Sequence, residues 1–309
     1  MSTRPADAAV SRHDIAQRPL SQVPACAALL ALLCLSTATH AITGSTSTTA
    51  FKNVDEGVQF APNWVLSASH VGFSIGGIYS NGHGSALVDA VYTPPGAGFP
   101  NHDLQLVHLA TPIAAAPALA LSGTLFSPTA FDLQNPSLNI DVTLTSNSNN
   151  VPGPRSYAFG QVREFADTLL DDHDNNANTP PLLRTVNWLI VHQNSFGAPY
   201  VQSGDSGGGL FFGHVTDQTS PHIGIASTLL TGVNGANSFA SGYVSVASYR
   251  GWIDATMTAN ASDDQLAQWV STPVPEPASW ALWFLGAAVF AATAHARCDL
   301  RSGQNKDHR

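Results

Sequence analysis

Ser206 lies in the segment SGDSGGGL, residues 203–210, between an acidic residue and three consecutive glycines. Glycine weakens a strand unless the backbone needs a positive φ or another group must approach closely. A serine hydroxyl is a weak nucleophile, so it needs a nearby base, a group that orients the base, and backbone donors for an oxyanion. The amides of Gly204 and Ser206 are candidates for those donors. Gly207 and Gly208 are expected to let a substrate backbone approach.

A histidine and an aspartate at strand ends are candidates for the two partners of the serine. His70 follows NWVLSAS (63–69), an apolar strand that breaks at small residues and leaves the imidazole at its end. Asp103 opens DLQLVHL (103–109), in which Leu104, Leu106 and Leu109 mark a buried strand. His70 is therefore the candidate base and Asp103 the candidate orienting acid.

These segments resemble the signature segments of chymotrypsin/trypsin-like serine proteases, in that family's order of His, Asp and Ser. WVLSASHV, NHDLQLVHLATP and SGDSGGGL carry the resemblance, which covers about residues 42–258. It implies Ser206 as nucleophile, His70 as general base and then acid, and Asp103 as the carboxylate that fixes the histidine tautomer. It also implies the amides of Gly204 and Ser206 as the oxyanion hole.

Short apolar runs separated by Gly, Pro and Asn clusters predict an all-β fold. The turn-rich stretch at 146–154 is a natural divide between two β units. The resemblance implies two six-stranded antiparallel Greek-key barrels, over 42–148 and 149–259, the second ending in a short helix around Trp252. Residues 260–273 are polar and contain proline, so they are predicted to be a linker.

Asp205 precedes the nucleophile in a loop that should be partly buried, so its carboxylate needs a cationic partner. Lysine and arginine are scarce in the middle of the chain. In the resembled family the partner is a newly exposed N-terminal amine. Cleavage after Ala41 exposes the sequence ITGS, and we expect the Ile42 amine to form an activating ion pair with Asp205. The alternative is an unattached N-terminus, with Asp205 held by hydrogen bonds.

The resemblance also implies the position of a substrate pocket. Tyr200 stands where trypsins carry the acidic residue at the pocket base, and Leu229 and Ser241 replace two glycines of the pocket walls. A preference for Arg or Lys is therefore not expected, and Leu229 is expected to restrict the pocket to small apolar side chains. Ser227 borders the pocket and is the implied auxiliary donor to Asp103.

The N-terminal residues 1–41 have the layout of a secretory signal peptide, with early arginines, an apolar run at 23–35 and then small residues. The apolar run is too short for a membrane span, which needs about 20 residues. Signal peptidase is therefore an expected partner. Cleavage after Ala38 is the alternative to cleavage after Ala41.

The C-terminal residues 274–309 begin with VPEPAS, continue as an apolar stretch and end in a basic tail. The apolar stretch predicts one transmembrane helix at 279–296, with the basic tail cytoplasmic. The segment resembles the PEP-CTERM sorting signal of Gram-negative bacteria, which implies handling by an exosortase-type enzyme and transient anchoring by the helix. An ordinary C-terminal anchor is the alternative. Both predict a catalytic domain in the cell envelope or outside the cell.

Acidic residues outnumber basic ones in the middle of the chain, so its surface repels phosphate backbones and nucleic acid is a poor partner. The histidines lack a pairing such as HExxH, so no metal site is predicted. Residues 171–179 resemble the start of a calcium loop, but Ala177 stands where glycine is required and Leu183 where a bidentate glutamate belongs. An acidic surface loop is the favoured interpretation.

These features together predict a secreted trypsin-like serine endopeptidase that cleaves protein or peptide substrates through an acyl-enzyme on Ser206, with no cofactor. The alternative is a catalytically inactive protease fold that serves as an adhesion or extracellular-matrix protein, because a fold does not by itself determine a function.

Overall fold

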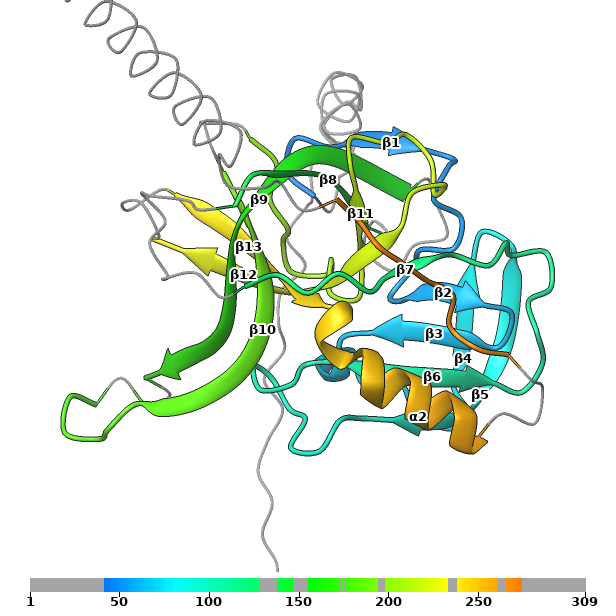
Figure 1. Ribbon diagram of the computed structural model, residues 1–309, viewed down its shortest axis with the longest axis horizontal. Coiled ribbons are helices and arrows are strands. Elements are labelled where there is room, and N and C mark those ends of the chain that lie inside the picture. The colour runs from blue at the N-terminus through cyan, green and yellow to red at the C-terminus, as the bar shows by residue number, and fades with distance from the viewer. Residues whose placement is uncertain are drawn as a thin grey trace, which may run out of the picture. The chain divides into compact units, whose positions relative to one another are not determined.

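The computed structural model describes residues 42–127, 138–146, 155–172, 174, 176–193, 198–232, 238–260 and 265–273. In these residues the protein consists mostly of β-strands in two sheets, with one short α-helix near the C-terminal end (Figure 1). The predicted all-β class is therefore confirmed. Among the described residues no helix is long and apolar enough to cross a membrane. The predicted signal peptide (1–41) and membrane span (279–296) lie outside the described residues.

The first sheet is open, like half a barrel. It has five strands in the order β2-β3-β6-β5-β4. Their bounds are β2 Val58–Ala61, β3 Trp64–Ser67, β4 Ile78–Asn81, β5 Gly84–Tyr92 and β6 Gln105–Leu109.

Side chains connect the two outer strands of this sheet in place of a backbone ladder. The Tyr79 hydroxyl on β4 donates to the carbonyl oxygen of Asn53 (3.0 Å), and the Asn81 amide donates to the side chain of Gln59 on β2. Asn53 and Gln59 are both fully buried. The resemblance implies a six-stranded barrel here, whereas the observed sheet has five strands and is open. The side-chain contacts supply hydrogen bonds to the buried Asn53 and Gln59, which buried polar groups need.

The second sheet closes on itself into a ring. Going round the ring, its strands are β8 Ile140–Ser146, β9 Arg155–Asp171, β10 Leu182–His192, β13 Phe239–Ser245, β12 His222–Thr231 and β11 Gly209–Phe212, and β11 pairs back with β8. All these pairings are antiparallel. Side chains alternate across each strand, so one face of every strand can fill the ring, where Ile42, Leu189 and Tyr243 are buried.

The observed division between the sheets differs from the predicted boundary at residue 148. β8 and β1 (Thr46–Thr48) precede that boundary, yet both pair with β9 in the second sheet. The turn-rich stretch at 146–154 therefore connects two adjacent antiparallel strands. Gly, Pro and Asn mark turns of every kind, so composition alone does not distinguish a hairpin connection from a domain boundary.

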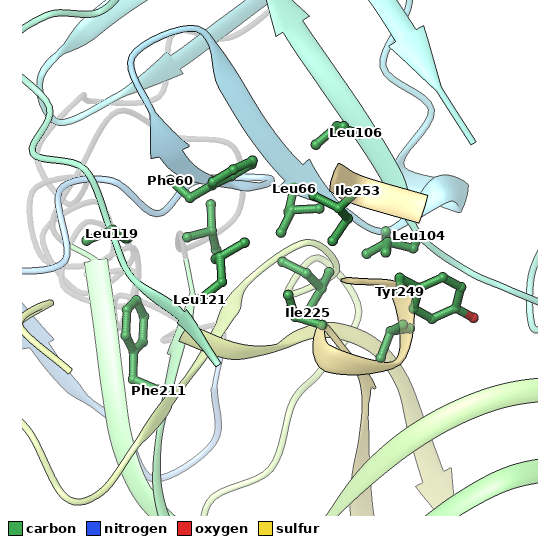
Figure 2. Close-up of a cluster of buried hydrophobic side chains, with 14 of the residues drawn as sticks. Phe60, Leu66, Leu104, Leu106, Leu119, Leu121, Phe211, Ile225, Tyr249 and Ile253 are labelled. Carbon is green, nitrogen blue, oxygen red and sulfur yellow. The ribbon is translucent and has the colours of Figure 1, made fainter. Parts of the chain in front are cut away.

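One apolar cluster joins both sheets to the helix α2 (Arg250–Asn260). Leu66 and Leu106 come from the first sheet, Ile225 from the ring and Ile253 from α2, and all four are fully buried. Figure 2 shows these side chains gathered in one region. Because the cluster is close-packed, it holds β3 and β6 of the first sheet against β12 of the ring and against α2.

Residues 265–273 pack on the protein, although the sequence predicts a linker there. β14 (Trp269–Val270) pairs in parallel with β7 (Leu121–Ser122). The Trp269 indole donates to Asp254 of α2 at 2.7 Å. A polar segment without periodicity gives no signal for this packing, because its partners lie on distant parts of the chain.

Candidate active site

Ser206 stands in a tight loop directly before β11. Gly204 (φ 98°) and Gly207 (φ 85°) flank it with positive φ, a conformation that glycine adopts without strain. The hydroxyl oxygen of Ser206 lies 2.7 Å from Nε2 of His70. The loop therefore brings the predicted nucleophile within hydrogen-bond reach of the predicted base.

Two paired strands of the first sheet bring His70 and Asp103 together. His70 lies in the 3₁₀ turn η1 (Ser69–Val71) after β3, and Asp103 immediately precedes the segment that enters β6. β3 and β6 are antiparallel, so the end of one lies beside the start of the other. Nδ1 of His70 lies 2.7 Å from Oδ2 of Asp103. Ser206, His70 and Asp103 thus form one hydrogen-bonded row.

Four donors surround the fully buried carboxylate of Asp103. Oδ1 accepts from the Ser69 hydroxyl (2.7 Å) and the His70 amide (3.0 Å). Oδ2 accepts from His70 Nδ1 (2.7 Å) and the Ser227 hydroxyl (2.6 Å). Burial by itself raises the pKa of Asp103, but the bonds from His70, Ser227 and Ser69 together lower this pKa below its ordinary value. The group therefore stays an ionised acceptor.

Ser227 contacts Asp103 as the resemblance implies, whereas sequence analysis does not single out Ser69. The only signal for Ser69 is its place directly before His70. A hydroxyl at that place becomes a donor to the acid only when the turn η1 lies against Asp103. This contact depends on the pairing of β3 with β6.

The amides of Gly204 and Ser206 have no hydrogen-bond partner among the described residues. Gly204 is exposed and Ser206 is partly exposed. Two unpaired amides beside an accessible serine hydroxyl are available to bind an oxyanion.

Gly207 and Gly208 are needed for the packing of the loop against the protein itself. A Cβ atom at Gly207 would lie 1.9 Å from the carbonyl oxygen of Glu56, and one at Gly208 would lie 2.4 Å from the carbonyl oxygen of Thr145. These contacts show a packing role for both glycines, and the expectation that they admit a substrate backbone stays a prediction. Glu56 lies in the segment before β2 and Thr145 lies in β8, so the loop packs between the segment that enters the first sheet and a strand of the ring.

Asp205 is buried beneath the loop, with 1 % of its surface exposed. Its carboxylate accepts from the Gln202 amide (2.6 Å) and from the Ser146 hydroxyl. Burial raises the pKa of Asp205 to about 6, although both hydrogen bonds lower it. Among the described residues no cation forms an ion pair with Asp205.

Ile42 lies in the ring core, close to the segment that binds Asp205. Its side chain is fully buried in the same apolar cluster as Val201. The next residue, Thr43, donates its amide to Tyr200 (3.1 Å) and accepts a side-chain hydrogen bond from Gln202. In the uncleaved chain the nitrogen of Ile42 is an uncharged peptide amide, so a charge on it requires cleavage after Ala41.

A cavity of about 360 Å³ adjoins Ser206 and His70. Leu229 and Ser227, two of the four predicted pocket residues, line it. Tyr200 stacks on Phe239 with ring centroids 4.4 Å apart. The other lining residues are Phe99, Val201, Gln202, Ser203, Ala226 and Thr228.

Ser241, the fourth predicted pocket residue, is fully buried, and its hydroxyl accepts from the Val201 amide at 3.0 Å. Ser241 and Tyr200 are not among the lining residues of the cavity. Phe99 is not singled out by the sequence. Its ring packs edge-on against the His70 ring, with the ring centroids 5.3 Å apart. Its loop is turn-rich in sequence, so only the packing reveals its place in the site.

In the described part of the chain, no three His, Cys, Asp or Glu side chains come together as a metal-ligand set. At the tip of the β9–β10 hairpin, Asp174 and Asn176 each accept a hydrogen bond from a backbone amide two residues on. Both residues are exposed. This local pattern is typical of surface turns.

Comparison of the chain with protein-family models gives no match, and comparison with curated proteins gives none. The chemistry of the site therefore has to be inferred from its geometry.

Proposed function

We propose that the protein is an exported serine endopeptidase of the chymotrypsin/trypsin-like type, which cleaves peptide bonds through an acyl-enzyme on Ser206. The observation that carries this proposal is the row from Ser206 through His70 to Asp103, with 2.7 Å at each step. The ring and the open sheet correspond, in this proposal, to the two Greek-key barrels of that family. The site residues come from the ends and connections of both.

The reaction uses groups of this chain alone. Ser206 attacks the substrate carbonyl carbon while Nε2 of His70 takes the hydroxyl proton, and the amides of Gly204 and Ser206 stabilise the oxyanion. The C–N bond breaks as His70 gives the proton to the leaving amine. Water then attacks the acyl carbon while Nε2 of His70 takes its proton. The ester bond to Ser206 breaks as His70 gives this proton to the Ser206 oxygen, and the acid product leaves. Asp103 stays ionised and holds His70 with the proton on Nδ1.

The cavity beside Ser206 is expected to bind the substrate side chain on the acyl side of the cleaved bond, and its lining favours an uncharged, apolar side chain. None of its lining residues is charged apart from the His70 imidazole, which is charged only when protonated. With export by the 1–41 segment and sorting by the 274–309 segment, the substrates are proteins or peptides outside the cytoplasm.

A fluorophosphonate probe tests the proposed function. The Ser206 oxygen should displace fluoride from the probe, so the native secreted protein should be labelled and the Ser206→Ala variant should not. Ser85→Ala, an exposed serine on β5, is the matched control and should label like the native protein. A folded native protein without Ser206-dependent labelling would contradict the proposal and favour an inactive adhesion or matrix protein.

If the Ile42 amine pairs with Asp205, the stability of the uncleaved protein should depend on pH near the pKa of Asp205. Cleavage after Ala41 should remove this dependence. In a form with Ala41 retained, a buried carboxyl with a folded-state pKa of about 6 makes the free energy of unfolding fall as pH rises from 4 through 6. The expected loss is roughly 3 kcal/mol. In the form that begins at Ile42, the ammonium group offsets the lost solvation of the carboxylate, so this loss should be absent.

Urea unfolding of both forms between pH 4 and pH 8 measures this difference. Superimposable pH profiles for the two forms would refute the ion pair, and a secreted protein whose first residue is not Ile42 would do the same.

A further inference from the structure

The residue before Asp103 has a rare backbone conformation. Of the described non-glycine residues, three have a positive φ, and two of these are His102 (φ 47°) and Asn187 (φ 50°). A left-handed conformation is unfavourable for residues with a Cβ and persists where the surrounding structure enforces it. His102 directly precedes Asp103, the acid of the hydrogen-bonded row from Ser206 through His70.

Both residues contact the same hydroxyl, that of Tyr249 in the turn η3 (Ala247–Tyr249) before α2. The Asn187 amide donates to this oxygen at 3.1 Å, and Nδ1 of His102 lies 3.0 Å from it. Since Asn187 fills an acceptor site, the hydroxyl is able to donate its own proton to His102. Burial lowers the pKa of His102 and raises the pKa of Tyr249 to about 12, which supports a neutral imidazole and a neutral phenol.

Further hydrogen bonds attach His102 and the residue before it to β10. The His102 amide donates to the carbonyl of Thr185 (2.8 Å), and the Thr185 amide donates to the Asn101 side chain (2.8 Å). The amide of Leu104 in turn donates to the carbonyl of His102 (2.7 Å), across Asp103. The backbone around Asp103 is thus held from β10 and from η3.

We propose that Tyr249 is a positioning residue, whose hydroxyl holds His102 in the left-handed conformation and thereby aims the Asp103 carboxylate at His70. It acts through Asp103, and its hydroxyl is bonded to His102 and Asn187. His102 and Tyr249 are 147 positions apart in the sequence, so the contact links the first sheet to the C-terminal end of the domain. The inference rests on the proposed function, because it concerns the orientation of the catalytic row.

Tyr249→Phe tests the inference, because it removes the hydroxyl and keeps the ring. We expect the variant to lower kcat on a chromogenic peptide amide about tenfold, with KM within about twofold, since small displacements of catalytic groups have large effects on rate. The rate of fluorophosphonate labelling of Ser206 should fall by the same factor. Tyr92→Phe on β5 is the control, because the Tyr92 ring packs on Trp64 and its hydroxyl makes no hydrogen bond to His102 or Asn187, and it should leave kcat unchanged.

Two variants of His102 separate positioning from general stability. His102→Asn tolerates the left-handed conformation and keeps an acceptor, so it should retain most of the activity. His102→Val lacks both properties and should lower kcat as Tyr249→Phe does, with no further fall in the double variant. Native kcat in Tyr249→Phe, or a fall in its unfolding midpoint alone, would overturn the inference. Either result would leave the proposed function standing, because labelling of the native protein at Ser206 tests that function separately.

Discussion

Replacing Asp103 by Asn is expected to lower kcat about 10⁴-fold while the protein stays folded; a loss of this size is known for the equivalent change in serine proteases of the chymotrypsin type. The physical reason is that four hydrogen-bond donors surround the carboxylate. Ser69 and the His70 amide donate to Oδ1, and His70 Nδ1 and Ser227 donate to Oδ2. Either orientation of an asparagine amide sets its NH₂ group against two donors.

The expected consequence is that His70 adopts the tautomer with its proton on Nε2, because Nδ1 no longer faces a carboxylate to which it can donate. Nε2, which faces Ser206, then cannot accept the serine proton. Steady-state kinetics on a peptide amide, with urea unfolding to verify the fold, measures the effect. Asp89→Asn is a matched control, because Asp89 also contacts a histidine, His108 (2.6 Å), at a partly exposed site. A loss of less than tenfold in Asp103→Asn would contradict the assigned role.

Peptides with Ala or Val before the cleaved bond should have a kcat/KM about 10³-fold higher than peptides with Arg or Lys there. Val201, Ala226 and Leu229 give the cavity apolar walls, and its lining holds no carboxylate. Burying an unpaired charge costs several kcal/mol, and each 1.4 kcal/mol is a factor of about ten. The expected ratio follows from about 4 kcal/mol of discrimination.

A peptide-amide series that differs only at this residue measures the ratio. Leu229→Gly should widen the cavity and raise cleavage after Phe. Tyr200→Asp should not create cleavage after Arg, because Tyr200 stacks on Phe239 and does not line the cavity. Native cleavage after Arg equal to that after Val would refute the apolar preference.

Much of the candidate site is predictable because its motifs are short and contiguous. His70 ends one apolar strand, Asp103 begins another, and Ser206 lies in a glycine-rich turn, so local pattern is enough to select them. Ser227 is predictable through the resemblance only. The structure brings all four into one hydrogen-bonded group.

Other contacts escape sequence analysis because their partners are far apart in the chain. The role of Gly207 depends on the carbonyl of Glu56, and that of Phe99 on the ring of His70. The packing of residues 265–273 depends on β7 and α2, which a polar sequence does not indicate.

The sequence by itself determined the β class and the order of His70, Asp103 and Ser206 along the chain, since strand periodicity and turn residues are local properties. It also predicts that Asp205 needs a cationic partner. Only the tertiary structure decided how open the first sheet is, which residues line the cavity, and that the Tyr249 hydroxyl meets His102. These depend on the close packing of side chains from both sheets and α2, where a contact forms only when every neighbouring element is in place.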